Sequence, residues 1–258
     1  MAEFDFTGTR ILVSNDDGIH ATGLKVLERI ARSLTDDVWV VAPEQEQSGA
    51  SHSLTMHRPL RLKQVGEQRY TVDGTPTDCV LLALNHLLAD RRPALVLSGV
   101  NHGSNIGEDI TYSGTIACAM EATLLGVRAI AMSQRIQGDA APHWDTAERF
   151  GPEVVRKAMA IDWPRHVLMN VNFPHCPPEQ VRGIQVVPHG NRKIGDELDE
   201  RVDPRGRRYF WIGPVRGEAE VPEDSDIHVV SHGGISITPI YLDLTHYACL
   251  DRLREAFS

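Results

Sequence analysis

Short apolar runs alternate with longer segments of helical periodicity along the first two thirds of the chain. Each apolar run is nearly continuous instead of alternating with polar residues, which is typical of parallel strands buried on both faces. The expected strands cover residues 11–13, 38–42, 95–97, 129–132 and 167–171, and the expected helices cover 23–34, 77–88, 115–125 and 145–160. This alternation predicts an α/β fold with a Rossmann-like, doubly wound and mostly parallel sheet.

Local signals support this outline. Thr75 stands before a proline, and Asp78 follows three positions later, which is the arrangement of a capping box at the start of a helix. Gly126 follows an expected helix at the place where glycine commonly takes the left-handed conformation. Residues 60–63 and 70–72 flank a turn that contains glycine, so they predict a β-hairpin.

The pattern changes after about Pro188. A charged stretch precedes Tyr209, Phe210 and Trp211, and a segment rich in Gly, Pro and Glu follows before an apolar run at 235–240. We interpret residues 1–258 as a single α/β domain in which about 189–258 form an extension rather than core. Three adjacent aromatic residues on a hairpin arm need a partner surface, so the extension is expected to contribute to homo-oligomer contacts. The alternative is an arm that folds back on its own chain.

The composition limits the classes of molecule that the protein is expected to bind. The net charge of −9 argues against binding to DNA or RNA duplexes and to anionic membranes, since such partners need clustered Lys and Arg. No apolar run is long enough to cross a bilayer, and the acidic N-terminal residues lack the apolar segment of a signal peptide. We therefore expect a cytoplasmic protein. The 4 cysteines are widely spaced, form no zinc-binding pattern and are expected to be free thiols.

Asp16 and Asp17 end the first apolar run and are followed at once by Gly18. In an open α/β sheet, chemistry is placed where strands become loops. A glycine with positive φ lets both carboxylates turn toward one point, and two such carboxylates favour a hard divalent cation. The alternative is a polar turn without a ligand, because Asn, Asp and Gly form turns on their own.

Ser48 and Asn101 lie on loops that follow two neighbouring strands, so they are expected at the same edge of the sheet as Asp16 and Asp17. Two carboxylates, a hydroxyl and an amide form an all-oxygen ligand set. Such a set suits Mg²⁺ or Mn²⁺ better than Zn²⁺. We predict one divalent cation held by these four residues.

Ser113, Gly114 and Thr115 stand at the mouth of an expected helix, where free N–H groups and hydroxyls favour an anion. Simple capping is the alternative. A glycine-rich loop with Asn101 and Asn105 precedes this helix and favours phosphate binding. A cation beside an anion site predicts a metal-assisted phosphomonoester hydrolase. The chain has no Walker A sequence, no G-x-G-x-x-G after the first strand and no G-x-S-x-G elbow.

Several motifs extend these observations along the chain: SNDDG at 14–18, AP at 42–43 with SGAS at 48–51, GTPTDC at 74–79, SGVNHGSN at 98–105, YSGT at 112–115, DPRG at 203–206, WIG at 211–213 and SITP at 236–239. On these motifs, the sequence resembles the SurE survival-protein family, phosphatases also described as 5′/3′-nucleotidases. The resemblance covers nearly the whole chain and implies a Rossmann-like core.

The resemblance also implies roles for individual residues. The implied ligands of the divalent cation are Asp16, Asp17, Ser48 and Asn101. The implied phosphate-binding residues are Asn105, Ser113, Gly114 and Thr115. The expected catalytic residues are Asp16, Asp17, Asn105 and Ser113. The implied substrates are nucleoside 5′-monophosphates, with 3′-monophosphates and short polyphosphate as further substrates, and the implied assembly is a homodimer or homotetramer.

The chain departs from the family at Thr22, where members often have proline, and at His102, where smaller residues are usual. His102 is either a proton donor to the leaving group or a surface residue. Two further functions stay open: a non-catalytic, metal-dependent nucleotide or phosphate sensor, and a phosphotransferase that passes the phosphoryl group to an alcohol. The attacking group is either water activated by the cation or a carboxylate of Asp16 or Asp17.

Overall fold

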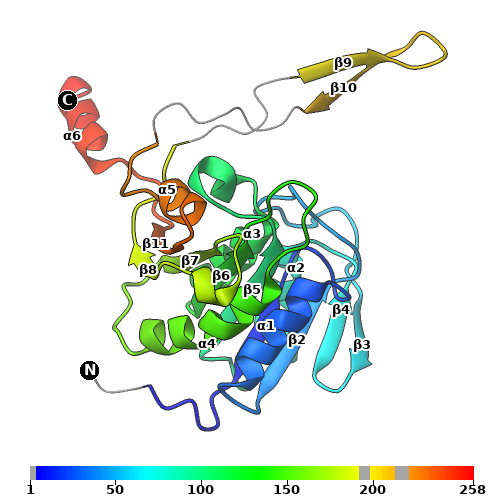
Figure 1. Ribbon diagram of the computed structural model, residues 1–258, viewed down its shortest axis with the longest axis vertical. Helices are drawn as coiled ribbons and strands as arrows, with labels where there is room; N and C mark the ends of the chain where they lie inside the picture. The colour runs from blue at the N-terminus through cyan, green and yellow to red at the C-terminus, as the bar shows by residue number, and fades with distance from the viewer. Residues whose placement is uncertain (1–3, 192–197, 213–220) are drawn as a thin grey trace.

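A computed structural model describes residues 4–191, 198–212 and 221–258. Within these residues, the centre is a nine-stranded sheet in the order β3-β4-β2-β1-β5-β6-β7-β11-β8 (Figure 1). Its strands are β1 (Ile11–Ser14), β2 (Val38–Pro43), β3 (Leu62–Gly66), β4 (Arg69–Val72), β5 (Leu95–His102), β6 (Arg128–Gln134), β7 (Val167–Phe173), β8 (Ile184–Val186) and β11 (Ile235–Tyr241). Strands β2, β1, β5, β6 and β7 pair in parallel, which confirms the predicted α/β sheet.

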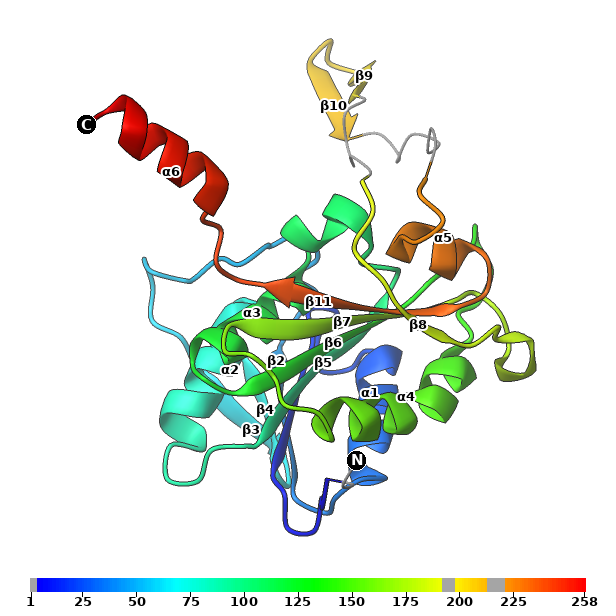
Figure 2. The same ribbon diagram turned by 90° about the vertical axis from the view of Figure 1, so that its left-hand side faces the viewer.

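Helices cover both faces of this sheet (Figure 2). The helices of one face are α1 (Thr22–Arg32) and α4 (Trp144–Met159), and those of the other are α2 (Pro76–Leu82), its π-helical continuation η1 (Ala83–Leu87) and α3 (Gly114–Leu124). The remaining short helices are η2 (Gly107–Thr111), η3 (Pro178–Gln180), α5 (Asp226–Ser231) and α6 (Tyr247–Ala256). No described helix has the length and apolarity needed to span a membrane.

Strand β1 shows why the apolar runs are continuous. Ile11 and Val13 pack in the core beside α1 and α4, whereas Leu12 packs in the core beside α2 and α3. All three side chains are fully buried, because successive residues of a strand point to opposite faces and both faces are covered. The sheet therefore leaves only its strand ends for polar side chains.

The local signals are also confirmed. Thr75 accepts a hydrogen bond from the Asp78 N–H (3.1 Å), and Asp78 accepts one from the Thr75 N–H (2.8 Å), so both bonds of the capping box form. Gly126 has a φ of 81° at the end of α3. Strands β3 and β4 form the expected antiparallel hairpin. The predicted helix over 77–88 changes at Ala83 from α-helical to π-helical bonding.

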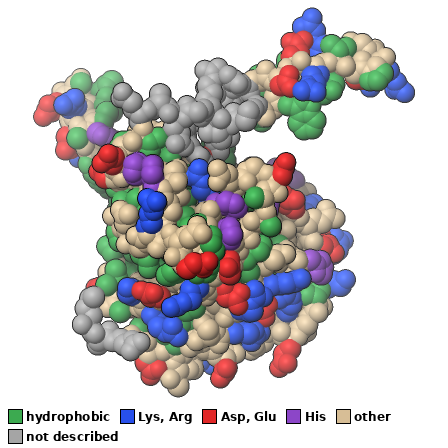
Figure 3. Space-filling model, in the orientation of Figure 1, with side chains coloured by type: hydrophobic (Ala, Val, Ile, Leu, Met, Phe, Trp, Pro, Cys, Tyr) green, Lys and Arg blue, Asp and Glu red, His purple; other side chains and the backbone are tan. Residues whose placement is uncertain are grey.

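The C-terminal region divides into two parts. Strands β9 (Leu198–Val202) and β10 (Arg208–Ile212) form a two-stranded arm, as expected, and every residue of both strands is exposed. The arm projects from the body (Figure 1), and it carries hydrophobic side chains among charges of both signs (Figure 3). Among the described residues, the arm therefore does not fold back on its own chain.

Strand β11 corrects the interpretation that the whole region after about 189 lies outside the core. It pairs antiparallel with β7 and parallel with β8, and Ile235 is fully buried. Pro239 suits a part of the strand that has a neighbouring strand on one side only. The pairing with β8 ends at Ile237, so Pro239 lies beyond the segment where β8 would need its N–H.

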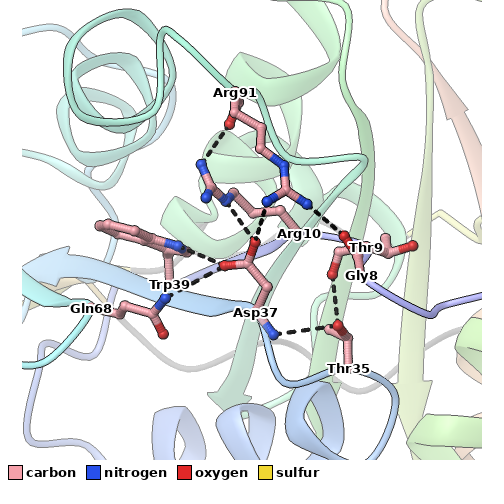
Figure 4. A network of polar contacts seen from close by, with 8 residues as sticks. All are labelled: Gly8, Thr9, Arg10, Thr35, Asp37, Trp39, Gln68 and Arg91. Atoms are coloured by element: carbon pink, nitrogen blue, oxygen red, sulfur yellow. Dashed lines mark hydrogen bonds and ion pairs between the residues drawn. The ribbon is translucent and has the colours of Figure 1, made fainter.

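At the amino ends of β1 and β2, Asp37 organises a network of polar contacts (Figure 4). Arg10 Nε donates to Asp37 Oδ2 (3.0 Å), and Arg91 forms a second ion pair with the same oxygen (3.4 Å). The indole N–H of Trp39 donates to Asp37 Oδ1 (2.9 Å). The negative charge of Asp37 is thus balanced by the guanidinium groups of Arg10 and Arg91.

Candidate active site

Three loops meet at the opposite edge of the sheet, where the parallel strands end. The N–H of Gln47, in the loop after β2, donates to the carbonyl oxygen of Asp16 (2.8 Å). The N–H of His102, at the end of β5, donates to Asp17 Oδ2 (3.1 Å). The convergence that the sequence predicted from strand order is therefore present.

Asp16 is the more deeply buried of the two carboxylates, with 3% of its surface exposed. The hydroxyl of Thr115 donates to its Oδ1 (2.5 Å). Burial raises the pKa of Asp16 to about 6; the negative charge of Asp17 adds to this rise, and the Thr115 hydrogen bond opposes it. Ionising Asp16 therefore costs free energy unless a cation is near.

Asp17 is half-buried beside it. Burial raises the pKa of Asp17, and the negative charge of Glu46 adds to the rise, whereas His102 lowers it through its N–H and its ring charge. Among the described residues, neither Asp16 nor Asp17 forms an ion pair with Lys or Arg. A divalent cation would supply the charge that this carboxylate pair lacks.

Glycines shape the space around the pair. A Cβ at Gly114 would lie 2.7 Å from the Asp16 Cβ and 2.9 Å from its Oδ2, so only glycine lets α3 approach this closely. Gly18 has a φ of 93°, as expected for the residue that releases the chain from β1. Asn15 donates to the Gly18 carbonyl (3.0 Å), but its own Oδ1 is buried and has no hydrogen-bond partner among the residues that the structure describes. These features fit a site that closes around a cation.

The other two predicted metal ligands lie at the same edge. Ser48 is exposed on the loop that contacts Asp16, and its hydroxyl donates to Glu46 (2.8 Å). Asn101 donates through Nδ2 to the Gly103 carbonyl (2.9 Å), so its Oδ1 is the atom suited to a cation. The described part of the chain holds no cluster of three His, Cys, Asp or Glu side chains able to bind a metal. A cation at Asp16 would therefore complete its shell with neutral oxygens, such as hydroxyl, amide, carbonyl or water oxygens.

Helix α3 begins directly beside Asp16. Ser113 caps it by accepting a hydrogen bond from the Ile116 N–H (3.1 Å), so the helix is capped as expected, and phosphate binding stays a prediction. The N–H groups of Gly114 and Thr115 belong to the first turn, where no intrahelical acceptor exists. These two groups and the positive end of the helix dipole suit an anion. Both the hydroxyl and the backbone N–H of Thr115 interact with Asp16, so of these two N–H groups the one of Gly114 is available to a phosphate.

Asn105 is buried in a polar network that the sequence did not reveal. Its Nδ2 donates to Ser133 Oγ (2.8 Å), and its N–H donates to Asn172 Oδ1 (2.8 Å). Its carbonyl accepts hydrogen bonds from Nδ2 of Asn170 (2.8 Å) and of Asn172 (3.0 Å). The available signal was the pair of asparagines in the otherwise apolar run of β7. This network fixes where Asn105 stands.

Asp226 is a second residue that sequence reasoning missed. It is fully buried and accepts hydrogen bonds from the N–H groups of Gly107 (3.0 Å) and Gly190 (2.7 Å). Because Gly107 follows Asn105 by two positions, the C-terminal region braces the loop that leads into α3.

Comparison with known proteins decides the family. The family model described as Survival protein SurE matches residues 11–196. The chain belongs to the SurE family. Two relatives named 5′-nucleotidase SurE are similar over nearly their full lengths. The one from Paramagnetospirillum magneticum is 55% identical over 253 residues, covering 98% of this chain and 97% of the relative. The one from Rhodospirillum rubrum is 52% identical over 256 residues, covering 98% of both chains.

A solved SurE structure agrees with the fold. The crystal structure of the SurE protein from Aquifex aeolicus has a TM-score of 0.84 to this chain at 36% identity, and the match covers 98% of this chain and 100% of that one. The resemblance drawn from the motifs and the predicted α/β fold class are both confirmed. The SurE motifs SNDDG and YSGT are the segments that bring Asp16, Asp17 and Thr115 together.

Proposed function

We propose that this protein is a divalent-metal-dependent phosphomonoesterase that hydrolyses nucleoside 5′-monophosphates to nucleoside and phosphate. The observation that carries the proposal is the buried carboxylate pair, without a cationic partner among the described residues, beside the open first turn of α3. The name of the relatives, 5′-nucleotidase SurE, supports nucleotides as the substrate class. Nucleoside 3′-monophosphates and short polyphosphate are proposed as further substrates.

One group of residues would bind the cation, and another would bind the phosphate. One Mg²⁺ or Mn²⁺ would be held by Asp16, Asp17, Ser48 and Asn101. When bound, it polarises the phosphoryl oxygens and makes a water molecule more acidic. The hydroxyl of Thr115 and the N–H of His102 orient the two carboxylates.

The phosphate would be received by the start of α3. The N–H of Gly114 would receive the anion there, with Thr115 next to it, and the hydroxyl of Ser113 stands at the same helix end. Asn105 is held rigidly by its network and would present its amide to the phosphate. These groups stabilise charge that develops on the phosphoryl oxygens during hydrolysis.

Phosphate release from nucleoside 5′- and 3′-monophosphates tests the proposal, with Mn²⁺, Mg²⁺ or EDTA and with the native chain and Asp17→Asn. Turnover that needs the metal and is lost in the variant is the expected result. Stoichiometric nucleotide binding without turnover would instead favour the sensor. Products that depend on an added alcohol would favour the phosphotransferase. Cytoplasmic location stays a prediction from the sequence.

The proposal includes assembly into a homodimer or homotetramer through the C-terminal region. Trp211 and Ile212 on the arm are 62% and 75% exposed, and Phe257 after α6 is 87% exposed. Such apolar surface favours burial against another copy. Light scattering should give a multiple of the chain mass for the native protein and a lower mass for Trp211→Ser with Ile212→Ser. Val186→Ser, which changes an exposed residue outside the arm, is the control.

A further inference from the structure

A cavity of about 410 Å³ opens directly beside Asp17. Its main lining residues are Asp17, Gly23, Glu46, His102, Pro142 and Trp144. A larger cavity of about 780 Å³ lies at the amino ends of the strands, near Asp37, and contains none of the candidate ligands. The smaller cavity is therefore the one that shares a wall with the proposed cation site, and its volume lies in the range of small-molecule pockets.

Two aromatic side chains form one wall of this cavity. The ring centroids of His102 and Trp144 are 6.1 Å apart, and their planes are inclined by 40°, so the rings do not stack on each other. His102 is exposed and Trp144 is half-buried. Both rings therefore keep surface that a flat aromatic ligand can cover.

The position of Trp144 depends on a glycine of α1. A Cβ at Gly23 would lie 3.1 Å from Cη2 of Trp144 and 1.9 Å from the carbonyl oxygen of Val100. Because Gly23 has no side chain, β5 and the indole ring of Trp144 can both pack against α1 at this position. The aromatic wall is built by the contact of three elements, α1, α4 and β5.

The polar lining brings two carboxylates together. Asp17, which follows Asp16 in the chain, and Glu46 both line the cavity, and Glu46 lies close enough to raise the pKa of Asp17. A carboxylate such as Glu46 readily accepts hydrogen bonds from sugar hydroxyls. Beside the proposed cation site, the cavity therefore offers a carboxylate and an aromatic surface, which are groups suited to the sugar and the base of a nucleotide.

We propose that this cavity binds the nucleoside part of the substrate, with His102 and Trp144 as the stacking surface for the base and Glu46 as the acceptor for the sugar hydroxyls. The inference rests on the proposed function, because the cation site must hold the phosphate. It assigns His102 a role in substrate binding, and it predicts that the enzyme prefers nucleotides over phosphate esters without a base because of this pair of rings.

The test compares adenosine 5′-monophosphate (AMP) with ribose 5-phosphate, which has the same phosphate ester and no base. His102→Ala keeps the backbone N–H that holds Asp17, and because the His102 side chain is exposed, its removal leaves the core packing intact. We expect its KM for AMP to rise about tenfold, with kcat and the values for ribose 5-phosphate unchanged. Trp144→Ala should behave alike, and Trp144→Phe should restore most of the affinity.

His143→Ala is the matched control, because His143 precedes Trp144, packs against His175 and does not line the cavity. It should leave both substrates unaffected. Equal KM changes for AMP and ribose 5-phosphate, or none for either, would overturn the inference. A fall in kcat on both substrates, with KM unchanged, would show a proton donor instead and overturn the inference.

A binding measurement separates this inference from the proposed function. Equilibrium dialysis of adenosine, which has no phosphate ester to hydrolyse, is performed on the native chain and on His102→Ala. If neither AMP nor ribose 5-phosphate is hydrolysed, the proposed function fails, while a tenfold weaker binding of adenosine to His102→Ala would still support the base-binding cavity. Equal binding by both chains would overturn it.

Discussion

Carboxylates lie at both edges of the same sheet, but the groups that surround them differ. At the amino ends of the strands, Asp37 meets two guanidinium groups and an indole N–H (Figure 4). At the carboxyl ends, Asp16 receives one hydroxyl and Asp17 one backbone N–H. A carboxylate that stabilises the fold is matched by charges of the chain, whereas a buried pair left without such charges is suited to a ligand.

The largest expected effect is a difference in turnover between a variant at the carboxyl edge and a variant at the amino edge. Asp17→Asn keeps the shape of the side chain and removes a charge that would bind the cation, so turnover of AMP should fall by about 10³-fold. Asp37→Asn should leave the turnover unchanged, because Asp37 lies at the other edge. Steady-state kinetics with Mn²⁺ measures both. Equal losses in the two variants would mean that the comparison between the edges is wrong.

Packing at the carboxyl edge gives the next effect. Gly114→Ala would place a Cβ 2.7 Å from the Asp16 Cβ, so the carboxylate or the start of α3 must move. A displacement of this kind should lower kcat by about 10²-fold. Gly66→Ala is the control, since its Cβ would meet only Arg69, at 3.4 Å. Full activity of Gly114→Ala would contradict the close approach of helix and carboxylate.

The pH dependence of metal binding follows from the raised pKa of Asp16. A cation binds the ionised carboxylate, and burial raises the pKa of Asp16 to about 6, so protons compete with the cation below that pH. The apparent affinity for Mn²⁺ should fall about tenfold per pH unit below about 6 and change little above it. Calorimetric titrations between about pH 5 and pH 7 measure this. An affinity that is constant across this interval would refute the assignment.

The smallest expected effects are on the free energy of unfolding. They have opposite signs for variants at the two edges. Asp37→Asn should lower the free energy of unfolding by about 2 kcal/mol, because charged hydrogen bonds are lost. The folded-state pKa of Asp16 lies above the unfolded value, so its ionisation opposes folding once the pH exceeds both values. Asp16→Asn should therefore stabilise the metal-free chain at neutral pH. Urea denaturation in EDTA tests both signs, and a loss of stability in each variant would contradict them.

Much of this edge was predictable because its signals are local. The apolar run 11–13 fixes the end of β1, and Gly18 directly follows the two carboxylates. The capping box of Thr75 and Asp78 spans four consecutive residues. Parallel strand order then brings the loops after β1, β2 and β5 to one edge. Local chemistry and topology were enough to place Asp16, Asp17, Ser48 and Asn101 at one edge of the sheet, and their role as metal ligands stays a prediction.

The remaining features depend on contacts between distant segments. Asn105 is bonded to Asn170 and Asn172, which lie 65 and 67 positions away in the chain. The aromatic wall joins residues 102 and 144, and it depends on a glycine at 23. The insertion of β11 beside β7 likewise reflects pairing that no local pattern specifies. Such features follow from the assembled sheet and its loops rather than from any single motif.

Calorimetric titration of Mn²⁺ into the metal-free native chain, with Asp17→Asn and Asp37→Asn measured alongside, addresses the difference between the two edges most directly. We predict binding of one Mn²⁺ per chain to the native protein and to Asp37→Asn. Binding to Asp17→Asn should be weakened by at least about tenfold. Undiminished binding to Asp17→Asn, or no binding to the native chain, would contradict the assignment of Asp16 and Asp17 to a cation.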